Sequence, residues 1–209
     1  MRRVVVVDYG IGNLYSITAA LAYLGLHPTV DTDGNTLKGG DAVVIPGVAR
    51  FGSAMGALHT RGQAGRLVEA YGEGRLLVGL CLGAQLLLES SEESPGEPGL
   101  GLIGGTVRKL KPRDAVVPNQ GWHRVARGEP PGPGYVDEAL WSDRYFYFSH
   151  SYRIELSNPL AQTGRITYGG ESVTALYETG NVVGMQFHPE LSGEAGLELL
   201  RGLLQGGRL

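Results

Sequence analysis

The stretch RLLVGLCLGAQLLLE, residues 75–89, contains the only cysteine of the chain and changes its pattern at that cysteine. The apolar run at 75–80 is typical of a parallel strand buried on both faces of a sheet. Cys81 follows this run, with Gly79 and Gly83 two residues away on either side. Glycines are expected there when a nucleophile occupies a tight turn, because side chains would clash. The stretch therefore predicts a strand, a sharp turn at Cys81 and then a helix.

The residues before this stretch alternate between strand-like and helix-like patterns. Short apolar runs are followed by segments whose apolar residues recur at helical spacing. Such alternation predicts a doubly wound, three-layer α/β/α fold of the flavodoxin-like kind, with ligands at the carboxyl ends of the strands. The predicted strands are 4–7, 27–32, 41–47 and 75–80, and the predicted helices are 14–24, 54–71 and 84–89. The segment 54–71 is expected to be mostly helical but interrupted by Gly56, Gly62 and Gly65.

The second half of the chain is dominated by strand-like patterns with little helix between them. Residues 172–188 predict a hairpin about the ETGN turn at 178–181, so we expect a mixed sheet with antiparallel C-terminal strands. The length of 209 residues favours one domain, residues 1–209. Further predicted features are strands in 102–110 and 145–152, a surface loop at 126–138 and a terminal helix within 191–205.

Composition and charge argue against several classes of function. A net charge of −3 is not that of a nucleic-acid-binding protein, which usually needs a clustered basic face. No apolar stretch approaches the roughly 20 residues of a membrane span. One cysteine cannot form an internal disulfide, so we expect a cytoplasmic protein. No metal or nucleotide motif is recognisable, and we expect a site that works without a cofactor.

A cysteine nucleophile needs a general acid and base, and the five histidines of the chain are the candidates. His188 lies in MQFHPE, residues 185–190, and Glu190 follows two positions later. In extended backbone this spacing puts both side chains on one side, so the carboxylate can hold the imidazole in one tautomer. Cys81, His188 and Glu190 are thus predicted to form a catalytic triad. The alternative, a structural buried cysteine, requires no glycine frame.

The motifs GLCLGAQLL and FHPE resemble those of the class I (triad) glutamine amidotransferases. The resemblance extends to the branch of this family that supplies ammonia for histidine biosynthesis. Segments similar to that branch occur in the same order along almost the whole chain. They are DYGIGNLYSI (8–17), PGVARFGSAM (46–55), PNQGWH (118–123), YFYFSHSY (145–152) and MQFHPELSG (185–193).

The resemblance implies a glutaminase reaction through a cysteine thioester. The thiol attacks the side-chain amide of glutamine, the histidine protonates the departing ammonia and then activates water, and the glutamate orients the histidine. Backbone N–H groups form the oxyanion hole. The implied residues are Cys81, His188 and Glu190 for catalysis, Gly47, Val48 and Leu82 for the oxyanion hole, and Gln85, Glu93, His150, Ser151 and Tyr152 for glutamine.

The same resemblance implies a partner subunit. In this branch the glutaminase forms a heterodimer with a cyclase subunit of (β/α)8-barrel fold, which receives ammonia through a tunnel. The positions that match partner-facing residues are Asn13, Trp122, Tyr145 and Tyr147. Strand alternation puts Phe146 and Phe148 on the opposite face, so we expect those two rings in the core.

Two positions depart from the pattern of the branch. The branch usually has the motif PGVG where this chain has PGVA, so Ala49 replaces a glycine. A Cβ at this position makes some backbone conformations costlier. We nevertheless expect activity to survive. Leu191 stands where a lysine is usual after FHPE, which removes a charge that could contact the partner.

Three alternative functions remain open on the sequence alone. The chain could be the glutaminase subunit of a chorismate-using synthase, although DYGIGN and YFYFSHSY favour the histidine branch. It could be a catalytically inactive regulatory module of the same fold, against which the retained Cys81, His188 and Glu190 speak. A cysteine peptidase or thiol-dependent esterase would turn over peptides or esters without an ammonia-accepting partner.

Overall fold

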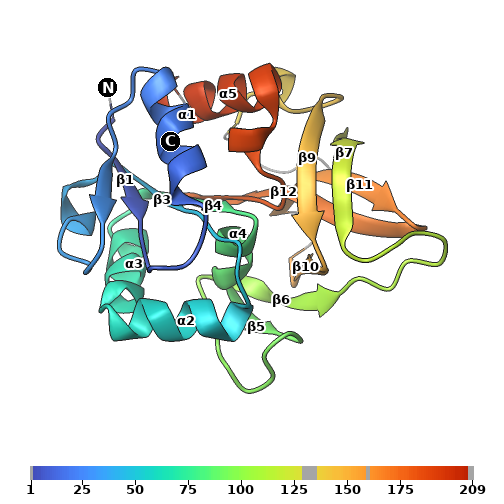
Figure 1. The fold of residues 1–209 in the computed structure, drawn as a ribbon, viewed down its shortest axis with the longest axis horizontal. Helices are drawn as coiled ribbons and strands as arrows, with labels where there is room; N and C mark the ends of the chain where they lie inside the picture. Colours follow the sequence, from blue (N-terminus) through green and yellow to red (C-terminus); the bar gives the residue numbers. More distant parts are fainter. Residues whose placement is uncertain (1, 129–135, 159–160, 207–209) are drawn as a thin grey trace.

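An eight-stranded mixed sheet forms the centre of the molecule, in the order β2-β1-β3-β4-β13-β12-β11-β8 (Figure 1). The strands from β2 to β13 in this order run parallel, and β12, β11 and β8 run antiparallel to their neighbours. This computed structural model describes residues 2–128, 136–158 and 161–206. The strands are β1 (Val4–Val7), β2 (Thr29–Asp31), β3 (Ala42–Ile45), β4 (Leu76–Leu80), β8 (Ala126–Arg127), β11 (Gln162–Tyr168), β12 (Glu171–Thr179) and β13 (Val182–Met185).

Two smaller sheets and five α-helices complete the described fold. One sheet has the order β10-β6-β5, and the other is the pair β7 and β9. Their strands are β5 (Leu88–Ser91), β6 (Ile103–Lys109), β7 (Asn119–Arg124), β9 (Tyr145–His150) and β10 (Tyr152–Leu156). The helices are α1 (Leu14–Tyr23), α2 (Phe51–Thr60), α3 (Gln63–Gly72), α4 (Leu82–Leu86) and α5 (Gly193–Arg201).

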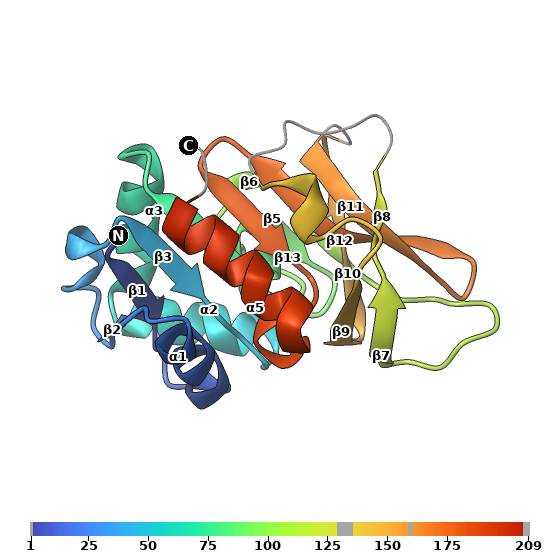
Figure 2. The ribbon, with the colours of Figure 1, turned by 90° about the horizontal axis from the view of Figure 1, so that it is seen from above.

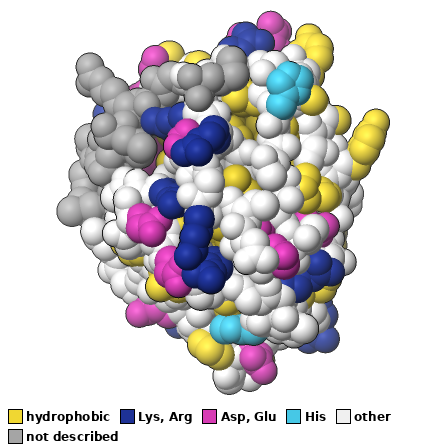
Figure 3. All heavy atoms as spheres, turned by 90° about the vertical axis from the view of Figure 1, so that its left-hand side faces the viewer, with side chains coloured by type: hydrophobic (Ala, Val, Ile, Leu, Met, Phe, Trp, Pro, Cys, Tyr) yellow, Lys and Arg dark blue, Asp and Glu magenta, His cyan; other side chains and the backbone are white. Residues whose placement is uncertain are grey.

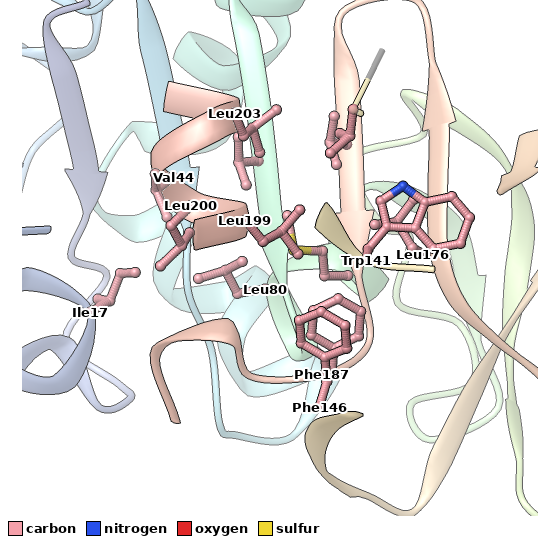
Figure 4. Close-up of a cluster of buried hydrophobic side chains, with 14 of the residues drawn as sticks. Ile17, Val44, Leu80, Trp141, Phe146, Leu176, Phe187, Leu199, Leu200 and Leu203 are labelled. Carbon is pink, nitrogen blue, oxygen red and sulfur yellow. The ribbon is translucent and has the colours of Figure 1, made fainter. Parts of the chain in front are cut away.

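Apolar layers cover both faces of the large sheet. Alternate side chains of β1 divide between them, Val4 joining a cluster with α1 and α5 and Val5 joining a cluster with α2 and α3. Figures 1 and 2 show α1 and α5 together on one face of the sheet, with α2 and α3 on the other. Figure 4 shows side chains of α5, such as Leu200, beside Leu80 of β4. The doubly wound three-layer architecture predicted from the sequence is confirmed.

Two helix predictions in the first half need correction. Of the three interruptions expected within 54–71, the one at Gly62, with a φ of 68°, is present between α2 and α3, whereas Gly56 and Gly65 lie inside continuous helices. A positive φ is easily reached by glycine but not by other residues. The helix expected at 84–89 is only α4, which ends at Leu86, and the chain continues as β5. A short apolar run such as 86–88 fits a strand as well as a helix.

Most secondary-structure predictions for the second half of the sequence are confirmed. The hairpin of β12 and β13 about residues 178–181 is present, and the C-terminal strands are antiparallel as expected. The terminal helix begins at Gly193 as α5 and continues as one π turn to Gly206. The surface loop predicted at 126–138 contains β8 at its start, and residues 129–135 lie outside the described part of the chain.

The order of the parallel strands brings three loops to one place. β4 lies between β3 and β13, with Gly79 opposite Ile45 on one side and Gly184 on the other. Because parallel strands end at the same edge of a sheet, the residues after β3, β4 and β13 meet there. Those residues are the loop 46–49 (PGVA), Cys81 and the segment 186–190 (QFHPE), which lie far apart in the sequence.

Exposed ion pairs lie on the surface of the molecule. Figure 3 shows Lys and Arg side chains next to Asp and Glu side chains on the face at the left of Figure 1. Arg3, which precedes β1, pairs with Asp41 at 3.1 Å, and Arg66 of α3 pairs with Glu69 at 2.8 Å. Such exposed pairs contribute little to stability, so the fold depends on its two apolar layers. Among the described helices, none has the length and apolar character needed to span a membrane.

Candidate active site

Cys81 occupies a strained turn directly after β4. Its φ of 51° and ψ of −108° are rare for a residue with a Cβ, and its N–H donates to the carbonyl of Met185 at 2.7 Å. Strain of this kind persists only where the surroundings enforce it. The observation therefore supports the predicted nucleophile elbow at Cys81.

The two glycines that frame Cys81 are both sterically required. A Cβ on Gly79 would lie 2.6 Å from the Cα of Ala84, which confirms the close approach expected within the turn. A Cβ on Gly83 would overlap the carbonyl oxygen of Ile45, which belongs to the neighbouring strand β3. The first glycine thus allows the turn to close, and the second allows the turn to pack against the sheet.

His188 and Glu190 lie beside the cysteine and pair with each other. The Nδ1 atom of His188 is 2.8 Å from Oε1 of Glu190, and both side chains are buried. The backbone at His188 is extended, as expected before a proline, but Glu190 lies in a 3-10 turn formed by Pro189–Leu191. The predicted pairing is confirmed, although the turn, rather than a continuous strand, brings the carboxylate to the ring.

The electrostatics of His188 favour an imidazolium. Burial lowers the pKa of His188, but the charge of Cys81, a hydrogen bond with Cys81 and the carboxylate of Glu190 outweigh it and raise the pKa to about 10. Since Nδ1 faces Glu190, the nitrogen that faces the sulfur of Cys81 is Nε2. A proton can therefore pass between Nε2 and a group that reacts at the sulfur.

The predicted oxyanion hole is not assembled in this conformation. The N–H of Leu82 donates to the carbonyl oxygen of Gly47 at 3.4 Å. The N–H of Val48 belongs to the same trans peptide as that carbonyl, so it points the opposite way. Only a rotation of this peptide would bring the N–H of Val48 beside that of Leu82.

A cavity of about 320 Å³ opens beside the sulfur of Cys81. It is lined by predicted glutamine-binding residues, including Gln85, Glu93 and the 150–152 segment. Larger cavities lie near Arg2 and along α1, but Cys81 does not line them. The cavity beside the sulfur is thus where the predicted nucleophile and the predicted binding residues meet.

Gln85 and Glu93 each use part of their side chain to hold the protein together. Nε2 of Gln85 donates to the carbonyl of Tyr152 at 3.2 Å and to Oε1 of Gln186 at 3.0 Å. Oε2 of Glu93 accepts the N–H of Phe51, the first residue of α2, at 2.7 Å. A contact of these side chains with a ligand therefore falls to the single oxygen of Gln85, Oε1, and to the second carboxylate oxygen of Glu93, also Oε1.

His150 is part of a buried polar chain. Its Nδ1 must donate to the carbonyl of Tyr152 at 2.8 Å, so its Nε2 accepts from Nδ2 of Asn119 at 2.9 Å. Oδ1 of Asn119 in turn accepts from Nε2 of His123 at 2.7 Å. Burial lowers the pKa of His150 to about 4 and keeps the ring neutral. Both ring nitrogens are thus occupied, so a contact between His150 and a ligand must come from its backbone.

Three of the four residues predicted to face a partner, Trp122, Tyr145 and Tyr147, form an aromatic surface on β7 and β9. Trp122 and Tyr147 are paired across these strands, with ring centroids 6.0 Å apart, and Trp122 and Tyr145 are more than half exposed. Phe146 and Phe148 are fully buried, as the alternation predicted. Asn13 is separate from this surface in sequence and caps α1, its Oδ1 accepting the N–H of Ser16 at 3.2 Å.

Sequence reasoning missed three polar residues of the site region: Gln186, Asn119 and His123. Gln186 is fully buried, and its Nε2 lies 3.7 Å from the sulfur of Cys81. The signal was available in part, because a glutamine between two apolar residues at the end of a buried strand is unusual. Within the described residues, no group of three or more His, Cys, Asp or Glu side chains could hold a metal ion.

Comparison with known proteins gives a consistent result. The family model of glutamine amidotransferase class-I matches residues 5–204. The imidazole glycerol phosphate synthase subunit HisH of Methanothermobacter thermautotrophicus is 42% identical over 205 residues, covering 97% of this chain and 98% of that protein. The subunit of the same name from Nostoc punctiforme is 38% identical over 201 residues, covering 96% and 94%.

Solved structures show the same fold at lower identity. A crystal structure of a glutamine amidotransferase has a TM-score of 0.72 and 21% identity, covering 96% of this chain and 97% of that one. The structure of PurLQS from Thermotoga maritima gives a TM-score of 0.72 at 20% identity, covering 98% of each chain. Together with the family match and the curated relatives, this establishes that the chain belongs to the class I glutamine amidotransferase family.

Proposed function

We propose that the chain is the glutaminase subunit of an imidazole glycerol phosphate synthase. The observation that carries the proposal is the contact of Cys81 with a His188–Glu190 pair at the edge of the sheet. Its relatives named as subunits of that synthase are 37–42% identical in four examples and match this chain over nearly its full length. The family supplies the glutaminase reaction, and these relatives supply the pathway.

The reaction begins at the sulfur of Cys81. The thiolate attacks the side-chain carbonyl carbon of glutamine, and the C–N bond of the tetrahedral intermediate breaks while Nε2 of His188 gives its proton to the departing nitrogen. Ammonia leaves, and a γ-glutamyl thioester remains on Cys81. Nε2 then takes a proton from water, which attacks the thioester and releases glutamate. Glu190 keeps the ring in the required tautomer and stabilises its positive form.

The oxyanion of both tetrahedral intermediates needs two N–H donors. One is the N–H of Leu82, which in this conformation donates to the carbonyl of Gly47 at 3.4 Å. The other is the N–H of Val48, which becomes available when the Gly47–Val48 peptide rotates. Rotation removes the carbonyl and supplies the second donor in the same step, so it acts as a switch for the site.

Glutamine binds in the cavity beside Cys81. Its α-ammonium needs acceptors, and Oε1 of Gln85 and Oε1 of Glu93 are the side-chain oxygens not engaged in the contacts described above. The backbone of His150, Ser151 and Tyr152 also lines the cavity and supplies contacts to the α-carboxylate. This arrangement leaves the carboxamide of glutamine next to the sulfur.

The ammonia passes to a cyclase subunit, with which the chain forms a heterodimer. The partner is a (β/α)8 barrel that receives ammonia through a tunnel and makes imidazole glycerol phosphate and an aminoimidazole carboxamide ribotide. Trp122 and Tyr145 are exposed and Tyr147 is partly exposed, so they give the glutaminase an aromatic surface, and aromatic residues are enriched at interface hot spots. The cytoplasmic location expected from the sequence belongs to the same proposal.

Glutamate and ammonia release from glutamine tests the reaction. The purified chain is assayed alone, with the cyclase, and with the cyclase and its nucleotide ligand. Cys81→Ala should abolish release, whereas external ammonium should still sustain the cyclase in that complex. A rate that rises with a chorismate-using synthase subunit and not with the cyclase would move the chain to the other branch of the family.

A pair of surface variants tests the partner. Trp122→Ala should weaken binding to the cyclase at least about tenfold, as expected for an interface hot spot. Tyr23→Ala is the matched control, because Tyr23 is also an exposed aromatic residue but lies at the opposite end of α1 from Asn13. Equal loss of affinity in both variants would argue against the aromatic surface as the docking site.

A further inference from the structure

A buried glutamine lies against the nucleophile and has no part in the mechanism described so far. Gln186 follows β13, has no exposed surface, and places its Nε2 3.7 Å from the sulfur of Cys81. This distance falls in the range of hydrogen bonds to sulfur. A fully buried amide is costly unless its polar atoms are bonded, so the position calls for a physical reason.

The orientation of this amide is fixed by its neighbours. The carbonyl of Tyr152 only accepts hydrogen bonds, so the atom of Gln85 that faces it at 3.2 Å must be Nε2. The same Nε2 donates to Gln186 at 3.0 Å, so the atom of Gln186 that faces it must be the oxygen. The other atom of that amide, which faces Cys81, is therefore the NH2 group.

We infer that the side-chain N–H of Gln186 donates to the Cys81 thiolate and stabilises it for attack on glutamine. The inference rests on the proposed function in one respect only, that Cys81 is the nucleophile. Gln85 then has a second task, because it holds the amide of Gln186 in the donating orientation. Gln85 donates both to the carbonyl of Tyr152 and to the oxygen of Gln186, and Gln186 donates to the sulfur, so each donor and acceptor in this set of contacts is determined.

The surroundings of the sulfur explain why such a donor is needed. As a thiol, Cys81 can donate to the carbonyl of Ser149, which lies 3.8 Å away. That bond is lost on ionisation, and a carbonyl facing a thiolate is repulsive. Cys81 is only 5% exposed, so water can do little to solvate the charge. Gln186 supplies an N–H donor in addition to His188, from a position that does not line the cavity beside Cys81.

The pH dependence of alkylation by iodoacetamide tests the inference on the free chain. Thiolate reacts and thiol does not, so the rate reports the ionisation of Cys81 without glutamine or a partner. Gln186→Met keeps the apolar volume but removes the donor. It should move the alkylation midpoint upward by about one pH unit, which slows alkylation roughly tenfold below the midpoint. If Gln186→Met shows the expected upward shift of the alkylation midpoint but the parent chain does not hydrolyse glutamine, the proposed function is wrong and this inference still holds.

Two other buried glutamines serve as controls. Gln85→Met should mainly raise KM for glutamine, with a smaller shift of the alkylation midpoint, because the side chain of Gln85 lines the cavity and is linked to the sulfur of Cys81 through the amide of Gln186. Gln63→Met removes three hydrogen bonds of a fully buried amide to Asp8 and Asp31. It should lower stability and leave the alkylation midpoint unchanged. A Gln186→Met protein that is folded and keeps the parental midpoint overturns the inference.

A second measurement needs no substitution at Gln186. In the ¹⁵N-labelled parent protein, the side-chain amide resonance of Gln186 should shift with the same midpoint as alkylation. The shift should disappear in Cys81→Ala, which removes the titrating sulfur. A Gln186 resonance that ignores the ionisation of Cys81 would contradict the inference even if Gln186→Met does not fold.

Discussion

The carbonyl oxygen of Gly47 lies 3.4 Å from the amide nitrogen of Leu82 and accepts its hydrogen bond. The donor that should stabilise an oxyanion at Cys81 is therefore engaged, and a partial negative charge occupies that place. Gly47 is held there by tight packing, since a Cβ on it would overlap the hydroxyl of Tyr9. Tyr9 in turn donates to the carbonyl of Pro46 at 2.7 Å. The proposed triad is thus assembled while the proposed oxyanion hole is closed.

The first prediction concerns the chain without its partner. Loss of one oxyanion donor costs about 10²–10³ in rate, so the free chain should hydrolyse glutamine slowly although Cys81 and His188 are in contact. Binding of the cyclase with its nucleotide ligand should raise the glutaminase kcat by roughly that factor. The check is glutamate release by the free chain and by the complex. A free chain that already turns over at the rate of the complex would contradict a closed hole.

The second prediction separates two neighbouring positions of the loop after β3. Gly47→Ala introduces a methyl group against Tyr9 and 2.9 Å from Cβ of Leu82, which should cost about 1–3 kcal/mol of stability. Ala49→Gly should change the glutaminase rate less than about threefold, because among the described residues Ala49 is not one of those with a positive φ. Urea unfolding and the glutaminase rate are measured for both variants. A many-fold gain in Ala49→Gly would show that the Cβ restrains the peptide.

The third prediction compares two Gly→Ala substitutions that differ only in surroundings. In Gly83→Ala the new methyl group would overlap the carbonyl of Ile45, so the elbow would have to move and stability should fall by more than about 3 kcal/mol. Gly56 lies inside α2 with open space around it, and Gly56→Ala should stabilise the helix by about 0.5–1 kcal/mol. Thermal unfolding measures both. Similar midpoints in the two variants would be inconsistent with an elbow packed against β3.

Much of the site could be predicted because short local sequence patterns indicate its residues. The glycines beside Cys81 indicate a tight turn, and the spacing of His188 and Glu190 indicates a pair. Alternation along β9 correctly placed Phe146 inside. Parallel strands that end at one edge then bring the separate segments together, so the fold class and the triad followed from the same reasoning.

Other features depend on contacts that no local pattern records. The helix after Cys81 ends early because the chain joins a second sheet as β5, and the run LLL fits a helix or a strand equally well. The hydrogen bonds that link His123, Asn119 and His150 require β7 and β9 to pair in one register. The direction of the Gly47 carbonyl depends on the rotation of the single peptide between Gly47 and Val48, and neither composition nor residue spacing predicts that rotation.

The fourth prediction concerns stability in acid. Burial lowers the pKa of His150 from 6.5 to about 4, so its neutral form stabilises the fold above pH 6.5. As the pH falls from 6.5 to 4, the unfolded chain takes up a proton that folded His150 refuses, and up to about 3 kcal/mol of stability is lost. His150→Gln keeps a donor and an acceptor but cannot titrate. Urea unfolding at pH 7, 5.5 and 4.5 should show a steeper loss in the parent protein, and parallel curves would refute the assignment.

The fifth prediction concerns the pairing of His188 with Glu190. Cys81 and, after it, Glu190 raise the pKa of His188 to about 10, so the stability that this protonated ring contributes is fully present below pH 6.5 and disappears as the pH rises through 10. Glu190→Gln removes a negative charge and should lower the NMR titration midpoint of the His188 ring by about one unit or more. The variant should be less stable than the parent at pH 6.5 and nearly equal to it at pH 10.5. Its kcat should fall roughly 10²-fold, because the ring loses its fixed orientation. An unchanged ring midpoint would mean that the 2.8 Å contact does not control the protonation of His188.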